Sequence, residues 1–413
     1  MQLSAVTQSA EELLTKIRNA GIAPNQHKEL ARRFNGVEVS ALVGRTPSHV
    51  TRTIAEMEKE GVCPPFQEEG RYRYEMTHVE ALRDRFGSHP CRDSEIDEPV
   101  VLAVQNFKGG VGKTTLALNL AQYLAMKGYR VLLVDMDSQA SATASFGIIP
   151  DVELAPEDTI LPFFDGVQDD LGYCIRPTHW PGLDLIPTNL ASFDMEWGVA
   201  KQLMDADNPE ERDFWTSRLR DGIDTVSDAY DVVIIDSPPS LGTTSMNILR
   251  AVDGLVIPTP AKLLDFASTV QYLRLVSDLS QRLGVDDHFK FISIVNTLYE
   301  GRDKASKEAR SKSDDPVSPN MQMQIRMLMH ELFQSGGFLV ETPFRKMAEI
   351  ENAAAAFSTV LEERRPLKSA SEIIQGVCEN IELNILKCWP SKAKEAHKLG
   401  KKLGISVSEE QDD

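Results

Sequence analysis

The residues best suited to chemistry are three glycines, two lysines and two threonines gathered in eight positions. They form the segment Lys108-Gly109-Gly110-Val111-Gly112-Lys113-Thr114-Thr115. Glycines let backbone N–H groups approach a phosphate chain, and a helix that starts there adds its positive end. In such a loop Lys113 reaches the β- and γ-phosphates, and the Thr114 hydroxyl holds Mg²⁺. The segment therefore predicts a site for a nucleoside triphosphate.

The segments on either side have the patterns needed to hold this loop between a strand and a helix. Residues 100–104 are apolar and mostly β-branched, which predicts a buried parallel strand. Residues 116–124 predict an amphipathic helix. A glycine-rich turn without a ligand is the alternative interpretation. The order of strand, turn and helix disfavours it, because this order presents a helix N-terminus to phosphate.

Carboxylates follow two further apolar runs. Residues 131–134 lead into Asp135 and Asp137, and residues 232–235 lead into Asp236. At the carboxyl edge of a parallel sheet such acids face the phosphate crevice. We expect Asp236 to bond to the shell of a bound Mg²⁺. An acidic turn after a strand can also be a simple helix cap, but the phosphate loop nearby favours a functional site.

Strand and helix patterns alternate from residue 100 onward, which predicts an α/β domain with a mostly parallel, doubly wound sheet. Further strands are expected at 183–187, 255–260, 291–296 and 338–340, and residues 200–227 look largely helical. No chemistry stands out between residues 150 and 230. Three tryptophans in that region, Trp180, Trp197 and Trp215, are expected to fill the core or an interface.

Residues 36–61 predict two short helices around a glycine turn. The first helix, over residues 37–43, ends at Gly44, and Thr46 can cap a second helix that starts at Pro47. Apolar residues at helical spacing face inward, which leaves polar side chains pointing outward near the start of the second helix. These are Ser48, His49, Thr51 and Arg52. The pattern is that of a helix-turn-helix, whose second helix contacts base edges.

A small hairpin over residues 67–74 could follow, with Arg71 and Arg73 on one face. Thr77 and Glu80 then cap another helix through Phe86. The whole unit resembles a winged helix-turn-helix, in which wing arginines contact phosphates and so position the protein. Three-helix units of this kind also serve as protein-contact modules, and the polar residues and wing arginines favour DNA binding over that alternative.

These patterns divide the chain into five segments. We expect an N-terminal helix over 1–35, a winged helix-turn-helix over 36–88, a linker over 89–99, a nucleotide-binding domain over 100–386 and a tail over 387–413. The first segment either packs on its own domain or makes a dimer contact. The tail is basic and then acidic and lacks a continuous apolar face, so no membrane attachment is expected.

Composition sets limits on these interpretations. The 413 residues, 42% of them hydrophobic, suffice for more than one domain. A formal net charge of −18 disfavours DNA binding by bulk charge, so local basic patches must provide it. No apolar run is long enough to span a membrane, and no signal peptide is evident. The five cysteines have no metal-ligand spacing, which favours a reducing, cytoplasmic location.

The phosphate loop departs from the ordinary P-loop pattern, because Phe107 stands where a glycine is usual and Lys108 is an extra lysine. This resembles the deviant Walker A box of the ParA/MinD family of P-loop ATPases. The resemblance implies that Lys108 crosses a dimer interface to the partner's nucleotide. It also implies that Asp137 orients the attacking water and that Asp135 helps to complete the Mg²⁺ shell. The implied catalytic residues are Lys108, Lys113 and Asp137, and the implied metal residues are Thr114, Asp135 and Asp236.

The same resemblance suggests further contacts. Residue Asn296 and the backbone around Pro343 match positions that contact the adenine of ATP or ADP. Arg302 matches a DNA-facing arginine, and Arg345 with Lys346 matches a second basic DNA contact. For each basic run a solvated surface is the alternative.

Residues 100–370 resemble ParA-type partition ATPases, and the amino-terminal unit resembles their long subclass, which includes RepA-like plasmid partition proteins. This implies a slow, Mg²⁺-dependent ATPase whose ATP-bound homodimer binds DNA without sequence preference. It also implies a ParB-type centromere-binding partner, nucleoid association, and repression of an operator through the helix-turn-helix. A nucleotide-sensing transcriptional repressor, in which hydrolysis is incidental, is the alternative. A nitrogenase-type reductase and a MinD-like membrane switch are disfavoured by the cysteine pattern and by the C-terminus.

Overall fold

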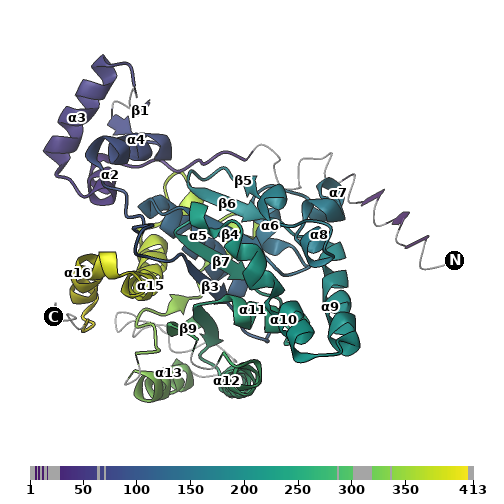
Figure 1. The fold of residues 1–413 in the computed structure, drawn as a ribbon. Coiled ribbons are helices and arrows are strands. Elements are labelled where there is room, and N and C mark those ends of the chain that lie inside the picture. Colours follow the sequence, from purple (N-terminus) through teal and green to yellow (C-terminus); the bar gives the residue numbers. More distant parts are fainter. Residues whose placement is uncertain are drawn as a thin grey trace.

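A computed structural model gives the fold (Figure 1). It describes residues 28–62, 66–68, 71–285, 288–300, 319–334 and 337–407, with isolated positions between 5 and 16. Most of the helix predicted over residues 1–35 lies outside the described residues, as do Arg302 and the acidic end of the tail. No helix among the described residues is both long and apolar enough to cross a bilayer.

The small domain at the upper left of Figure 1 contains the predicted pair of helices and a two-stranded hairpin. Its elements are α2 (Gly36–Val43), α3 (Pro47–Lys59), β1 (Phe66–Glu68), β2 (Arg71–Arg73) and α4 (Met76–Phe86). The helices enclose a separate apolar core that includes Val39, Val50 and Leu82. The arrangement is helix, turn, helix, antiparallel hairpin and helix, as the sequence predicts.

Helix caps explain where these elements begin and end. Asn35 and Glu38 form a capping box at the start of α2, and Gly44 ends α2 in the left-handed conformation. Thr46 holds the N-cap position of α3, but its side chain caps no backbone N–H group. The cap predicted at Thr77 is wrong. The helix starts two residues earlier, at Met76, and Glu75 is its N-cap, where the ring of His78 accepts from the backbone N–H of Glu75 at 3.0 Å.

The large domain is built on an eight-stranded, mostly parallel sheet with the order β10-β9-β8-β3-β7-β4-β6-β5. The strands are β3 (Val100–Val104), β4 (Val131–Asp135), β5 (Arg176–Pro177), β6 (Leu183–Ile186), β7 (Val232–Asp236), β8 (Gly254–Pro260), β9 (Phe291–Tyr299) and β10 (Phe344–Arg345). Only the edge strand β5 runs antiparallel to its neighbour. The strand predicted at residues 338–340 is wrong: Leu339 makes a single bridge to Ile294, and β10 pairs with β9 further along.

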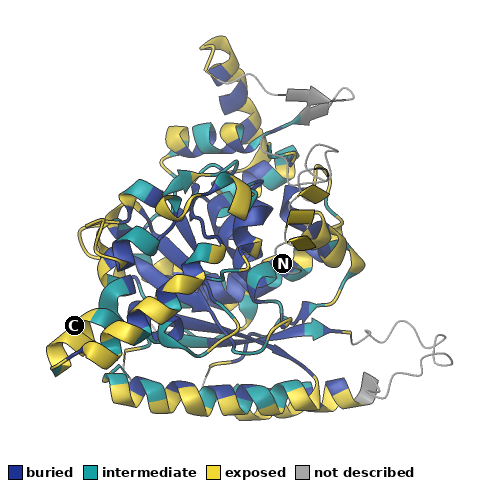
Figure 2. Ribbon diagram, turned by 90° about the vertical axis from the view of Figure 1, so that its right-hand side faces the viewer, coloured by how far each residue is buried: buried dark blue, intermediate teal, exposed yellow. Residues whose placement is uncertain are grey.

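Helices cover both faces of this sheet, because alternate residues of each central strand point to opposite sides (Figure 2). On one face lie α5 (Lys113–Lys127), α14 (Ala348–Ala355), α15 (Lys368–Lys387) and α16 (Ala393–Leu403). On the other lie α8 (Leu161–Phe164), α9 (Phe193–Asp205), α10 (Pro209–Asp224), α11 (Thr243–Ala251), α12 (Leu263–Leu283) and α13 (Pro319–Phe333). Two short helices, α6 (Ser141–Ser145) and α7 (Pro150–Glu153), follow β4. The sheet with two helical layers confirms the predicted fold class.

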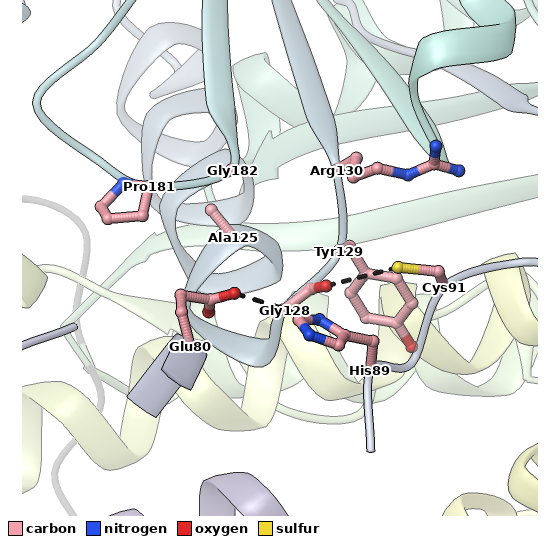
Figure 3. A pocket seen from close by; sticks show the side chains of 9 residues that line it. All are labelled: Glu80, His89, Cys91, Ala125, Gly128, Tyr129, Arg130, Pro181 and Gly182. Atoms are coloured by element: carbon pink, nitrogen blue, oxygen red, sulfur yellow. Dashed lines mark hydrogen bonds and ion pairs between the residues drawn. The ribbon is translucent and has the colours of Figure 1, made fainter. Parts of the chain in front are cut away.

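The small domain is joined to the large one by buried polar contacts. Arg83 of α4 is fully buried, pairs with Glu80, and donates from Nη2 to the carbonyl of Met126 at 2.6 Å. Beside this contact lies a cavity of about 440 Å³, whose lining includes Glu80, His89 and Cys91 (Figure 3). It lies at the C-terminal end of α5. The phosphate loop is at the other end of this helix, about 22 Å away at 1.5 Å per residue.

Candidate nucleotide and magnesium site

The phosphate loop joins β3 to α5 at the carboxyl edge of the sheet. Gly110 and Gly112 have φ values of 73° and 91°, a region that side chains with a Cβ rarely enter. Gly112 is the N-cap of α5, and Lys113 is its first residue. The Thr297 hydroxyl of β9 donates to the carbonyl of Val111 at 2.8 Å and so anchors the loop. The loop N–H groups and the helix N-terminus therefore share one place, as the sequence predicts.

Lys113 is held within this loop. Its side chain is buried, and its Nζ donates to the carbonyl of Lys108 at 3.1 Å. Burial lowers the pKa of the Lys113 ammonium, while the nearby carboxylates of Asp236 and Asp137 partly restore it. A buried ammonium that forms no ion pair with a described carboxylate is well suited to bind the negative charge of a phosphate chain.

Asp135 and Asp236 lie side by side, because β4 and β7 are adjacent parallel strands whose register pairs these two residues. The Asp135 carboxylate accepts from the backbone N–H of Thr143 at 2.8 Å and from its hydroxyl at 2.7 Å. Asp236 is fully buried, and neither of its carboxylate oxygens has a well-formed hydrogen bond among the described residues. Asp137 lies two residues after Asp135, and its backbone N–H donates to Asp135 at 3.2 Å.

The electrostatics of this acid pair favour a cation between them. Burial, the largest cause, raises the pKa of Asp135 to about 7, and hydrogen bonds from Thr143 oppose the rise. Burial, followed by the charge of Asp135, raises the pKa of Asp236 well above its ordinary value. The Thr114 hydroxyl and the Lys113 ammonium lower the pKa of Asp236 in part. Two carboxyl groups in this setting bind a proton or a metal ion.

These residues fit Mg²⁺. The two orphaned oxygens of Asp236 lie buried beside Thr114, and Asp135 stands on the next strand. Among the described residues no group of three or more His, Cys, Asp or Glu side chains forms a protein-only metal site. That agrees with Mg²⁺, which takes one or two carboxylates and completes its shell with water and substrate phosphates.

The ammonium of Lys108 forms an ion pair within its own chain. Its Nζ pairs with Oδ1 of Asp265, in the first turn of α12. The Lys108 side chain remains 37% exposed, whereas Asp265 is 14% exposed. The Lys108 backbone N–H is fixed by the Asn106 side chain at 3.1 Å. Lys108 therefore lies at the surface of the loop, and its charge is paired with a carboxylate of the same chain.

The residues predicted to contact adenine lie on β9 and just before β10. Asn296 is buried, its Nδ2 contacts the sulfur of Met329 at 3.4 Å, and its Oδ1 has no hydrogen-bond partner among the described residues. Pro343 is buried directly before β10. A separate cavity of about 280 Å³ opens beside Thr114 and Thr115, between α5, α6 and α14.

Three residues that support the site were missed from the sequence. Thr143 holds Asp135, Asp265 holds Lys108, and Glu196 caps the helix that follows Asp236. Thr143 lies eight positions after Asp135 on a short helix, so its hydroxyl was within the reach of sequence reasoning. The pair of Lys108 with Asp265 spans 157 positions and that of Glu196 with Thr243 spans 47, and no local pattern marks such contacts.

The residues predicted to contact bases lie at the start of α3. Ser48, Thr51 and Arg52 are exposed there, and Arg52 lies 3.9 Å from Glu56, a weak surface pair. His49 is half-buried, and its ring packs on Phe86 with centroids 5.1 Å apart. Three of the four side chains are thus open to a ligand, while His49 also supports α4. Their contact with DNA stays a prediction.

The other predicted DNA contacts that the structure describes lie in two different places. Arg73 lines a cleft of about 400 Å³ between the two domains, together with Arg32 and Arg364. Lys346 pairs with Glu300 at 3.3 Å and with Glu351 at 3.7 Å, and Arg345 is half-buried on β10. Residue 302 and the side chain of Arg71 lie outside what the structure describes. Among the described side chains, Arg73 therefore lies apart from Arg345 and Lys346.

Comparison with known proteins shows which proteins this chain is related to. Residues 100–289 match the family described as "AAA domain". Protein SopA of Escherichia coli K12 is 33% identical over 374 residues, which are 87% of this chain and 90% of SopA. The chromosome-partitioning ATPase Soj of Thermus thermophilus is 31% identical over 211 residues, 51% of this chain and 74% of Soj.

A solved structure titled "Partition Protein" covers 92% of this chain and 98% of its own, with a TM-score of 0.61 and 20% identity. That likeness shows that the fold, including its N-terminal part, is shared. Two further observations point to the same family. The match to SopA covers most of both chains, and the phosphate loop carries an extra lysine, Lys108. The chain therefore belongs to the ParA-type family of ATPases that partition plasmids and chromosomes, in the group with an N-terminal extension.

Proposed function

We propose that this chain binds ATP with Mg²⁺ at the phosphate loop and hydrolyses it slowly, with the ATP-bound form acting as a homodimer. The loop N–H groups and Lys113 would hold the phosphate chain. Thr114 and Asp236 would hold Mg²⁺, with Asp135 in its shell. Bound Mg²⁺ neutralises charge on the transferred phosphoryl group. Asp137 would orient the attacking water, and Lys108 would reach the nucleotide of the second copy.

The observation that carries this proposal is that neither carboxylate oxygen of Asp236 has a well-formed hydrogen bond to another described residue. A fully buried carboxylate without hydrogen bonds is strongly unfavourable unless a ligand completes its environment. Its neighbours are the hydroxyl of Thr114, the ammonium of Lys113 and the second carboxylate of Asp135. That set is the one needed to hold a metal ion between a protein and a triphosphate.

DNA segregation would follow if the nucleotide bound at the phosphate loop controlled the binding of DNA. We propose that the ATP-bound dimer binds DNA without sequence preference, that a ParB-type centromere-binding protein stimulates hydrolysis, and that α3 reads an operator. The supporting features are the exposed polar residues at the start of α3 and the joining of the two domains through Arg83. The protein would then lie on the nucleoid in the cytoplasm.

Replacement of Lys113 tests the nucleotide site. Lys113→Ala is expected to abolish binding of a fluorescent ATP analogue, because the other ammonium of the loop, that of Lys108, is paired with Asp265. Lys127→Ala, at the other end of α5, is the matched control and should bind as the unmodified protein does. Circular dichroism would check that both variants fold. Retained nucleotide affinity in Lys113→Ala would refute the site.

A further inference from the structure

Helix α9 carries an exposed apolar stripe that no other described element covers. Phe193, Trp197 and Met204 are 53%, 67% and 85% exposed. At about 100° per residue these positions fall within about 40° of one another around the helix, and they span about 16 Å along it. The opposite side of α9 packs Met195 and Val199 into the core. Trp197 was predicted to fill the core or an interface, and its exposure excludes the core.

The segment that carries this stripe has a net negative charge. Between residues 190 and 213 the chain carries seven carboxylates and two cationic side chains. On α9 itself Asp194 and Asp205 are exposed beside the stripe, and Lys201 is the single cation. Asp207, Glu210 and Glu211 follow on the surface of the neighbouring turn and α10. DNA and anionic lipid headgroups carry the same sign of charge and would be repelled.

The charge also disfavours a second copy of this chain as the occupant. A two-fold contact would place the stripe against itself, so the carboxylates of both copies would face each other. A cationic segment with apolar side chains matches the stripe in both charge and apolar surface. Its apolar side chains would cover Phe193, Trp197 and Met204, and its lysines or arginines would meet the surrounding carboxylates.

The stripe is connected to the N-terminus of α11 through Glu196, the residue before Trp197. The Glu196 carboxylate accepts from the N–H of Thr243 at 2.6 Å, and from the N–H and the hydroxyl of Thr244 at 3.0 Å and 2.6 Å. These groups form the N-terminus of α11, which follows Asp236 after a short segment that contains Pro238 and Pro239. A molecule docked on α9 would therefore act on the helix that ends this segment.

We propose that the α9 stripe is the docking site for a basic, amphipathic segment of a protein partner, and that docking changes the rate of ATP hydrolysis through Glu196 and α11. The proposal rests on the proposed function, in which the ParB-type protein is this partner. It adds the surface that this partner recognises and the route from that surface to the acid that holds Mg²⁺.

The test uses the full chain and a fluorescein-labelled 18-residue helical peptide of lysine and leucine, with the leucines on one face. Fluorescence anisotropy should show binding to the unmodified protein. Trp197→Ser should weaken this binding at least tenfold, because it removes the centre of the stripe. Leu275→Ser, at a 50% exposed position on α12, is the matched control and should bind as the unmodified protein does.

Two further peptides separate the contributions to binding. A lysine–serine peptide of equal charge should bind more weakly and be insensitive to Trp197→Ser, and a glutamate–leucine peptide should not bind. The lysine–leucine peptide should also change the ATPase rate of the unmodified protein and of Leu275→Ser, but not that of Trp197→Ser.

Several results would overturn the proposal. Equal binding of the lysine–leucine peptide to both variants would show that general charge attraction, not the stripe, holds it. An unchanged ATPase rate with the peptide bound would remove the route through Glu196. Loss of self-association in Trp197→Ser without peptide would identify a second copy as the occupant. If neither the unmodified protein nor any variant hydrolysed ATP, the proposed function would be wrong. The anisotropy measurement would still show whether the peptide binds at the α9 stripe.

Discussion

The ammonium of Lys108 pairs with the carboxylate of Asp265 in the same chain, across 157 positions of sequence. The two groups join the phosphate loop to the first turn of α12. In the proposed dimer Lys108 must instead reach the nucleotide of the second copy. The intrachain pair and the dimer contact therefore compete for one charge.

Replacement of Asp265 by asparagine should favour the dimer. A partly exposed ion pair contributes up to about 1 kcal/mol, and two such pairs would be released per dimer. Asp265→Asn should therefore lower the dimer dissociation constant in the presence of an ATP analogue by up to about thirtyfold, at about 1.4 kcal/mol per factor of ten. Analytical ultracentrifugation over a concentration series measures it. Asp278→Asn, further along α12, is the control, and weaker dimerisation of Asp265→Asn would exclude competition.

The acid pair predicts how stability without nucleotide depends on pH. The pKa of Asp135 is about 7 in the folded protein against an ordinary value of 3.8, so the folded state keeps a proton that the unfolded state releases. This contribution is full below the ordinary value and is lost as the pH rises through about 7. Asp135→Asn has no such proton.

Urea unfolding at pH 5 and pH 7.5, without Mg²⁺ or nucleotide, measures this difference. Between these values the unmodified protein should lose more stability than Asp135→Asn. Asp151→Asn, on the exposed helix α7, controls for an effect of total charge. Parallel pH dependence of Asp135→Asn and the unmodified protein would contradict the assigned protonation of the folded state.

Arg52 tests the role of α3. Because base contacts specify and phosphate contacts only position, Arg52→Ala should weaken binding to the operator while nonspecific DNA binding of the ATP-bound form remains. A loss of about 1–3 kcal/mol at the operator is expected for one base-reading arginine. Competition binding at two salt concentrations measures both affinities, with Lys59→Ala at the end of α3 as control.

The outcome of the Arg52 experiment also separates the two function classes. A partition ATPase keeps salt-sensitive, nonspecific DNA binding in Arg52→Ala, whereas a repressor that binds DNA through α3 alone loses binding to both kinds of DNA. Equal losses at operator and nonspecific DNA would therefore contradict the recognition role of α3 within a partition protein.

The sequence was sufficient for the features that depend on local pattern. The apolar strands that end in Asp135 and Asp236, the glycine loop and the paired helices of the small domain all follow from short-range periodicity and turn residues. Placement of both acids at one edge of the sheet also followed, since parallel strands end at the same edge, whereas the pairing of β4 with β7 came from the structure.

What could not be predicted depends on contacts between distant segments. The pairing of Lys108 with Asp265, the cap that Glu196 provides for α11, and the exposure of Trp197 all require the packed structure. The strand predicted at residues 338–340 was wrong for a related reason. Residues 338–340 are apolar and so satisfy the strand pattern. In the structure, however, only Leu339 forms a bridge to β9, at Ile294.

The central claim is that nucleotide state controls the association of two copies through Lys108. Sedimentation velocity of the full chain with ADP or with a non-hydrolysable ATP analogue, beside Lys108→Ala under the same conditions, tests it most directly. The account predicts a shift from monomer to dimer with the ATP analogue in the unmodified protein, and no shift in Lys108→Ala although it still binds the analogue. The same association state with both nucleotides, or a full shift in Lys108→Ala, would contradict it.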